Sequence, residues 1–282
     1  MRAEIPSGGI RNGPRVPLSS FFELEQTGWE RAAPYYEACW TDTELFVDAL
    51  LDAADVGPGT RLLDVACGPG LVSEAAAARG ATPVGVDFAP AMVAAARARC
   101  PGLEFAVGDA QALQFPDRAF DGVTMNFGIL HLSEPERALA EARRVLAPGG
   151  RFAFTAWIAD GNAVAEIVDT AVAAHAVPVE LPHGPPFYRF ADPQEAARAV
   201  VDAGFAADTV RIDTKTRVVR FPTAELLFEA ELKAGVRTAA VLARQPADRL
   251  DRIRTAIVDG VRRYADDDGF ALPVVARVIS AS

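Results

Sequence analysis

Short apolar runs alternate with amphipathic stretches through the middle of the chain, between Arg61 and Trp157. The apolar runs have the length and the β-branched or aromatic content of buried strands. Glycine and proline mark the boundaries of the helical stretches between them. The pattern predicts five strands (61–66, 83–87, 103–107, 120–126 and 151–157) and three intervening helices (71–79, 90–99 and 134–146). This alternation is typical of an α/β fold with a doubly wound, mostly parallel sheet.

The sequence before and after this core follows other patterns. Residues 1–20 are rich in proline, glycine and arginine, which predicts a flexible N-terminal tail. Apolar positions at helical spacing over 21–54 predict N-terminal helices that form a lid. After Trp157, a helical stretch at 163–177 and a run rich in Pro, Gly and His predict a cap inserted at 158–190.

The C-terminal part of the chain, 191–282, returns to the pattern of the core. It contains a predicted helix (193–203), a strand within 205–221, two helices (223–244 and 247–264) that form a helical insertion at 223–268, and a final strand (270–279). The expected molecule is therefore a Rossmann-like, seven-stranded sheet, with its core at 55–157 and a helical cap.

The charge balance limits the expected partners. Asp and Glu number 38 against 28 Lys and Arg, a formal net charge of −10. Because nucleic-acid binding needs basic side chains to neutralise phosphates, we expect no nucleic-acid partner. The chain has no apolar run of membrane-spanning length and no secretory signal, so we expect a cytoplasmic protein without a membrane partner, either a monomer or a homodimer. Cys39, Cys67 and Cys100 form no paired motif, and no metal site is predicted.

The most informative stretch is Leu62-Leu63-Asp64-Val65-Ala66-Cys67-Gly68-Pro69-Gly70, where a buried strand turns sharply into a helix. Gly68 and Gly70 let a ligand approach the backbone, and the free N–H groups at the helix start can receive a carboxylate. Asp87 ends the next strand, 23 residues after Asp64. An acidic side chain at that place can accept hydrogen bonds from both hydroxyls of a ribose.

Asp64, Asp87 and Asp109 thus lie at the ends of three successive strands. No Lys or Arg in these turns offsets the charge of a pyrophosphate, which disfavours nucleotides that carry one. The loop also lacks G-x-G-x-x-G, which disfavours a nicotinamide dehydrogenase. The carboxylates suit a ligand with an ammonium and a sulfonium group, with Asp64 placed to attract the ammonium and Asp109 placed to meet an adenine amine.

These motifs resemble those of class I S-adenosylmethionine-dependent methyltransferases, particularly the small-molecule branch that includes the ubiquinone/menaquinone C-methyltransferases. The resemblance covers the chain from Val56 to Trp157. It rests on 62–70, Gly85-Val86-Asp87-Phe88 with Met92, Gly108-Asp109-Ala110, the Phe120-Asp121 strand opening and 144–152. It implies that 55–157 binds S-adenosylmethionine, with S-adenosylhomocysteine as the product.

The same resemblance implies roles for individual residues around the cofactor. Asp64, Ala66, Gly68 and Gly70 are expected at the methionine end, Asp87 at the ribose, Phe88 and Met92 on a face of the adenine, Asp109 and Ala110 at its polar edge, and Asn126, Phe127 and Gly128 beside the sulfonium. Ala66 stands where the family usually has the first loop glycine. We expect this methyl group to narrow the loop slightly without loss of binding.

Residues that act on the methyl acceptor are less sharply indicated. His131 follows the fourth strand and can act as a general base on an acceptor hydroxyl; the other interpretation is that it pins the loop before the next helix. An aromatic face can lie over the sulfonium or the substrate, or it can anchor the N-terminal helices to the core. The substrate-pocket candidates are Tyr35, Tyr36, Trp40, His175, His183 and Tyr188.

The function predicted from the sequence is methyl transfer to an O, N or C nucleophile of a small molecule, in specialised metabolism. Methyl transfer from a sulfonium needs alignment and desolvation more than a fixed catalytic residue. Two alternatives remain open. The first is a methyltransferase-like fold that retains the cofactor but catalyses a cyclisation or rearrangement, and the second is a non-catalytic binding subunit.

Overall fold

The computed structural model describes residues 20–39 and 42–282. The N-terminal tail predicted at 1–20, apart from Ser20, and the candidate Trp40 lie outside the described residues.

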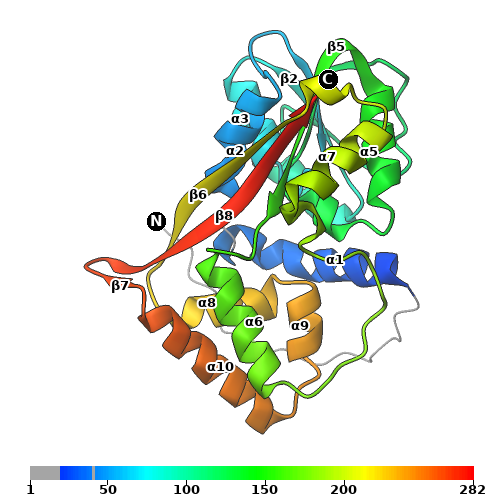
Figure 1. The fold of residues 1–282 in the computed structure, drawn as a ribbon. Coiled ribbons are helices and arrows are strands. Elements are labelled where there is room, and N and C mark those ends of the chain that lie inside the picture. The colour runs from blue at the N-terminus through cyan, green and yellow to red at the C-terminus, as the bar shows by residue number, and fades with distance from the viewer. Residues whose placement is uncertain (1–19, 40–41) are drawn as a thin grey trace.

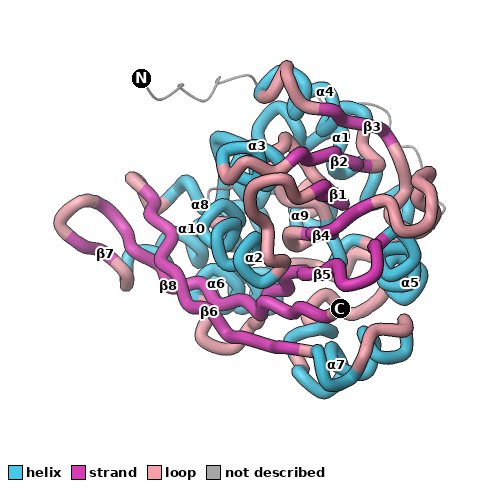
Figure 2. Tube along the Cα trace, turned by 90° about the horizontal axis from the view of Figure 1, so that it is seen from above, coloured by secondary structure: helices cyan, strands magenta, loops and turns pink. Residues whose placement is uncertain are grey.

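One twisted sheet runs through the molecule (Figure 1). Its strands are β1 (Arg61–Val65), β2 (Thr82–Asp87), β3 (Glu104–Val107), β4 (Phe120–Met125), β5 (Leu146–Trp157), β6 (Arg211–Phe221), β7 (Ala265–Asp266) and β8 (Gly269–Ala281). The strand order is β3-β2-β1-β4-β5-β8-β6, as Figure 2 shows from above, and the two-residue β7 pairs with β8 outside this path. Strands β1 to β5 are parallel, whereas β8 runs antiparallel to β5 and β6. The predicted α/β fold with a doubly wound, mostly parallel sheet is confirmed.

Helices cover the two faces of this sheet. Helices α2 (Val47–Ala53) and α3 (Leu71–Ala78) contact each other on one face, and α5 (Pro135–Val145) and α7 (Pro193–Asp202) contact each other on the other face (Figure 1). Helix α4 (Pro90–Arg99) connects β2 and β3. Side chains such as Phe152, Phe154 and Leu139 are fully buried between the layers. Burial of this apolar surface is the main source of stability for the core.

A second group of helices gathers beyond one end of the sheet (Figure 1). The group consists of α1 (Phe21–Cys39), α6 (Ala163–His175), α8 (Glu225–Lys233), α9 (Arg237–Leu242) and α10 (Ala247–Arg262). Single helical turns complete the connections: η1 (Thr43–Phe46), η2 (Gly128–His131), η3 (Arg189–Ala191) and η4 (Ala207–Thr209). Within the described ranges, no helix is both long enough and apolar enough to cross a lipid bilayer.

Two elements differ from the predictions by more than two residues at a boundary. The single helix predicted at 223–244 is wrong: α8 ends at Lys233 and α9 begins at Arg237. A Cβ on Gly235 would lie 2.6 Å from the carbonyl oxygen of Glu231, so the chain makes a close turn here that only glycine tolerates. Strand β5 begins at Leu146 rather than at Arg151, and its register against β4 shifts there.

Candidate active site

The loop after β1 turns the chain sharply from the strand into a helix. Ala66, Gly68 and Gly70 have φ angles of 54°, 52° and 88°, which are left-handed conformations. Such a conformation is easy for glycine and costs roughly 1 kcal/mol for alanine at position 66. Gly70 is also the residue that precedes α3, so the loop delivers the chain directly to a helix N-terminus. The partial positive charge at the N-terminus of that helix can attract an anionic group.

Asp87 ties this loop to the end of β2. One carboxylate oxygen accepts the Gly68 N–H and the other accepts the Ala89 N–H, both at 2.9 Å. Burial raises the pKa of Asp87 to about 6, against the lowering effect of these two hydrogen bonds. Each oxygen retains a lone pair, because a carboxylate oxygen can accept more than one hydrogen bond. Asp87 is therefore held in place and can still accept from a ligand.

A cavity of about 370 Å³ opens at this edge of the sheet. Its walls include most of the predicted cofactor residues: Ala66, Gly68, Asp87, Phe88, Met92, Asp109, Ala110, Asn126, Phe127 and Gly128. Residues far apart in the sequence thus meet in one space, since the carboxyl ends of parallel strands lie along one edge. Asp109 accepts from the backbone and the side-chain amide of Gln111, which fixes its carboxylate.

Asp64 and Gly70 are predicted cofactor residues that do not line the cavity. Asp64 is fully buried, and it accepts hydrogen bonds from the hydroxyls of Ser73 at 2.7 Å and Thr124 at 3.4 Å. Burial raises the pKa of Asp64 to about 7. These hydrogen bonds connect β1 to α3 and β4, so Asp64 stabilises the elements on either side of the loop. A Cβ on Gly70 would contact the ring of Phe105, so this glycine permits close packing.

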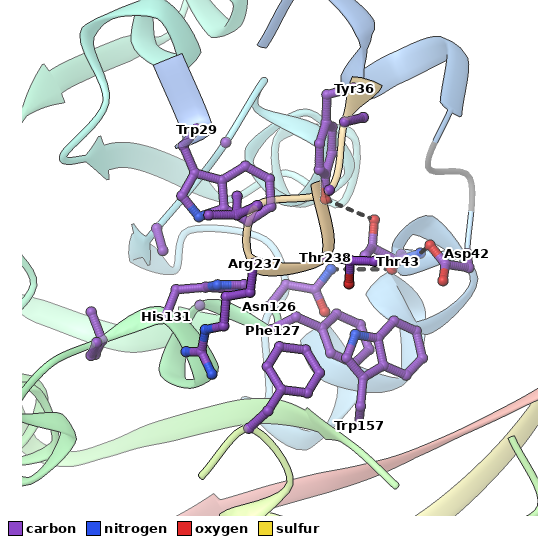
Figure 3. Close-up of a pocket in the computed structure, with 18 of the residues that line it drawn as sticks. Trp29, Tyr36, Asp42, Thr43, Asn126, Phe127, His131, Trp157, Arg237 and Thr238 are labelled. Carbon is purple, nitrogen blue, oxygen red and sulfur yellow. Dashed lines mark hydrogen bonds between the residues drawn. The ribbon is translucent and has the colours of Figure 1, made fainter. Parts of the chain in front are cut away.

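An aromatic wall stands at the end of β4. Phe127 stacks on Trp157, with ring centroids 3.9 Å apart and planes 16° apart (Figure 3). Phe46 packs against both rings in T-shaped contacts. Thr155 accepts the Phe127 N–H at 2.7 Å and donates to the side-chain oxygen of Asn126 at 2.8 Å. These contacts hold Phe127 in its left-handed conformation and fix the amide of Asn126.

His131 lines the cavity from the turn after β4, and it has a partner that the sequence does not indicate. Its Nδ1 lies 2.8 Å from a carboxylate oxygen of Glu25 in α1. The Trp29 ring meets the imidazole edge-on with centroids 4.8 Å apart. Arg237 also pairs with Glu25 and lines the same space (Figure 3).

The predicted substrate residues divide into two groups. Tyr36 and Tyr188 line the cavity. Tyr35, His175 and His183 do not: Tyr35 packs against Cys39, Ala230 and Ala234, His175 ends α6, and His183 borders a separate hollow beside Phe21. Trp40 lies outside the described residues.

Several cavity residues were missed by reasoning from the sequence. They are Trp29, Asp42, Thr43, Trp157, Asp169, Phe187, Glu231 and Arg237. Burial raises the pKa of Asp42 to about 6 and that of Glu231 to about 7. No short motif marks these residues, because they come from helices and loops whose polar positions look like ordinary solvent-facing ones.

Comparison with known proteins identifies the central part of the chain. A family model described as "Methyltransferase domain" matches residues 63–154. A demethylmenaquinone methyltransferase from Renibacterium salmoninarum is 45% identical over 102 residues, which are 36% of this chain and 43% of that protein. The chain therefore matches less than half the length of this relative.

Solved structures resemble most of the chain. A putative methyltransferase from an antibiotic biosynthesis pathway of Anabaena variabilis has a TM-score of 0.58 at 18% identity, over 86% of this chain and 100% of that one. The [4+2]-cyclase SpnF has a TM-score of 0.57 at 20% identity, over 94% and 97% of the two chains. At these identities the likeness shows the fold alone. The family match shows a methyltransferase domain at residues 63–154, and this part of the chain resembles class I S-adenosylmethionine-dependent methyltransferases.

Proposed function

We propose that this protein transfers a methyl group from S-adenosylmethionine to a small apolar acceptor of the quinone or quinol type. One observation carries the proposal: Asp87, Asp109 and the loop residues Ala66 and Gly68 line one end of a cavity whose other end combines apolar side chains with buried carboxyl groups. The first end has the donors and acceptors that an adenosyl ligand needs. The second end can take an uncharged ring system.

The residues at the first end fit the parts of the cofactor. The carboxylate of Asp87 would accept the ribose hydroxyls, and Asp109 with Ala110 would meet the polar edge of the adenine. Phe88 and Met92 would cover its face. The loop residues Ala66 and Gly68, with Asn126 and Phe127, would lie at the methionine end. When bound, S-adenosylmethionine supplies an electrophilic methyl group whose transfer leaves a neutral thioether.

The chain's own contribution is alignment and exclusion of water. The stacked rings of Phe127 and Trp157 close one side of the cavity, and the hydrogen bonds to Thr155 keep that wall in place. Positioning two reactants in this way contributes roughly 7–11 kcal/mol to lowering a barrier. We retain His131 as the proposed general base for a hydroxyl on the acceptor.

The acceptor class rests on the lining of the second end and on the curated relatives. Val164, Val168, Phe187 and Val236 give this end an apolar surface, and Glu231 adds a buried carboxyl with a raised pKa. A quinol has an apolar ring system and hydroxyl groups that can meet such a carboxyl. Relatives such as the Renibacterium salmoninarum protein are demethylmenaquinone methyltransferases, which favours the same class.

We also propose that the chain is divided into a lid (21–54), a cofactor-binding core (55–157), a cap (158–190) and a C-terminal part (191–282) with a helical insertion (223–268). We propose a role in specialised metabolism and a cytoplasmic location. We propose that the protein is a monomer or a homodimer and that it has no nucleic-acid or membrane partner.

An isotope experiment tests the proposed reaction. The purified protein is incubated with S-adenosylmethionine carrying a trideuterated methyl group and with reduced demethylmenaquinone of short side chain, and the products are analysed by mass spectrometry. We expect the label in the quinol and an equal amount of S-adenosylhomocysteine. An unlabelled rearranged product would favour the cyclase alternative, and cofactor binding without any product from a panel of quinols and phenols would contradict the acceptor class.

A further inference from the structure

Glu25 is a buried carboxylate at the junction of three elements. It lies in α1, and its side chain is fully buried. One of its oxygens lies 2.8 Å from Nδ1 of His131, and the other accepts from Nε of Arg237 at 2.5 Å. The same arginine donates to the carbonyl oxygen of Leu130 at 2.5 Å. The lid helix, the turn after β4 and the start of α9 therefore meet at this carboxylate.

The surroundings of Glu25 favour its ionised form. Burial alone would raise its pKa, but the neighbouring His131 and Arg237 outweigh burial, and the pKa lies below its ordinary value. An isolated buried carboxylate is very costly, and its two hydrogen-bonded partners reduce that cost. An ionised carboxylate can only accept hydrogen bonds. The atom facing it on the imidazole, Nδ1, must therefore carry a hydrogen.

This contact determines which ring nitrogen of His131 is left for a ligand. In a neutral imidazole with its hydrogen on Nδ1, Nε2 carries the lone pair. Within residues 20–39 and 42–282, no hydrogen bond engages Nε2. The imidazole lines the cavity, and the edges of Trp29 and Phe187 restrict its rotation. The ring thus presents a basic nitrogen in a fixed orientation.

We propose that Glu25 is a positioning residue that holds His131 in the tautomer protonated at Nδ1, so that Nε2 accepts a proton from a hydroxyl of the methyl acceptor. This inference rests on the proposed function. It makes the acceptor a phenol or hydroquinone, whose ionised oxygen activates the molecule as a nucleophile.

The hydroxyl proton moves to Nε2, and the electron pair of the O–H bond stays with the acceptor. The acceptor forms a bond to the methyl carbon at that oxygen, or at the ring carbon beside it, and the carbon–sulfur bond breaks with its electron pair left on sulfur. After attack at carbon, the proton on that carbon leaves to water and the oxygen takes back the proton from Nε2, which restores the aromatic ring, the hydroxyl group and the neutral imidazole. The imidazolium that forms at His131 is stabilised by the negative charge of Glu25.

Glu25→Gln is a near-isosteric test of this arrangement. Arg237 can only donate, so the amide oxygen of the glutamine is expected to face the arginine and the amide nitrogen to face His131. Nδ1 must then accept, which transfers the ring hydrogen to Nε2 and removes the base. Glu37→Gln is the matched control. Glu37 lies in α1, as Glu25 does, but its carboxylate pairs with Arg99 and does not contact His131.

Two readouts separate positioning from a merely structural role. The first is ¹⁵N NMR of the imidazole nitrogens in a background with His175→Gln and His183→Gln, which leaves His131 as the one histidine among the three of the sequence. The second is kcat with S-adenosylmethionine and reduced demethylmenaquinone of short side chain. We expect hydrogen on Nδ1 in the parent protein and on Nε2 after Glu25→Gln, with kcat lowered about 100-fold. S-adenosylhomocysteine affinity should change less than about twofold, well below the tenfold that corresponds to about 1.4 kcal/mol.

The outcomes are distinct. Hydrogen on Nε2 in the parent protein would overturn the proposal, and this measurement needs no change at Glu25. An unchanged kcat after the tautomer has switched would overturn it as well. His131→Asn provides a second variant, because its amide can still donate to Glu25 while it lacks Nε2; retained kcat in this variant would also contradict the proposal. If the parent protein binds S-adenosylhomocysteine and has the expected tautomer but methylates no quinol or phenol, the proposed acceptor class fails while the tautomer assignment stands.

Discussion

Two aspartates at neighbouring strand ends show how burial separates the roles of similar residues. Asp87 lines the cavity and accepts hydrogen bonds from two backbone N–H groups, whereas Asp64 is buried beneath the loop and accepts hydrogen bonds from two hydroxyl groups. Reasoning from the sequence placed both at the ligand, because both end a buried strand. The difference arises from Ser73 and Thr124, which enclose Asp64 from α3 and β4.

Replacement of Asp64 by Asn should stabilise the protein without ligand at pH 8. The pKa of this carboxyl is raised from 3.8 to about 7 by burial, so between these pH values the folded state holds a proton that the unfolded state has lost, and at pH 8 the folded state carries a buried negative charge. The stability from Asp64 is therefore fully present below about pH 4 and is lost as the pH rises to about 7. We expect Asp64→Asn to raise Tm by roughly 5 °C at pH 8 and to have little effect at pH 4.

Thermal melts across this pH range check the prediction for Asp64. A variant that melts at or below the temperature of the parent protein at pH 8 would contradict it. Because Asp64 does not line the cavity, S-adenosylhomocysteine affinity should fall less in this variant than after a change at Asp87.

At the scale of elements, one close contact joins α1 to the helices at 223–268. Gly28 of α1 faces Val236 in the connection between α8 and α9, and a Cβ at this glycine would lie 2.3 Å from a methyl carbon of the valine. Arg31 reinforces the same junction by donating to the carbonyl oxygen of Gly235 at 2.6 Å. Helix α1 and the connection between α8 and α9 are therefore packed against each other through a position without a side chain.

Gly28→Ala tests that packing. Alanine favours a helix by about 1 kcal/mol, but overpacking costs about 1–3 kcal/mol, so we expect a net loss of stability. Tm should fall by a few degrees, and the apparent KM for the acceptor should rise. Gly57→Ala is the control, because a Cβ there meets nothing within 4 Å and should leave both quantities unchanged. A Gly28→Ala protein as stable and as active as the parent would show that the lid does not depend on this contact.

The elements that the sequence predicts well are those with a local signal. The second strand, predicted at 83–87, is observed at Thr82–Asp87, since strands buried on both faces are almost continuously apolar. The helix predicted at 223–244 is interrupted at a close turn, where Gly235 approaches the carbonyl oxygen of Glu231 in α8. Helical periodicity does not reveal such a turn. Glu25 was missed for a related reason. Its partner Arg237 lies 212 residues away, and nothing local distinguishes it from Glu30 or Glu37 in the same helix.

At the scale of the molecule, the two ends of the cavity come from different parts of the chain. The proposed cofactor end is built by the strand ends within residues 63–154, the part that matches the family model. The proposed acceptor end is built largely by α1, α6, α8 and α9, which lie outside it. This division explains why the sequence predicts the cofactor residues better than the substrate residues: the former belong to motifs, and the latter depend on how the helices pack over the sheet.

Calorimetric titration of S-adenosylhomocysteine into the purified protein tests the central claim most directly. We expect one site per chain in the parent protein. Asp87→Ala should weaken affinity at least tenfold, about 1.4 kcal/mol, because the variant loses the carboxylate expected at the ribose hydroxyls. Asp121→Ala, which removes an exposed carboxylate paired with Arg61 near the start of β4, should bind like the parent. The account would be contradicted if the folded parent protein bound neither S-adenosylhomocysteine nor S-adenosylmethionine. It would also be contradicted if Asp87→Ala left the affinity unchanged.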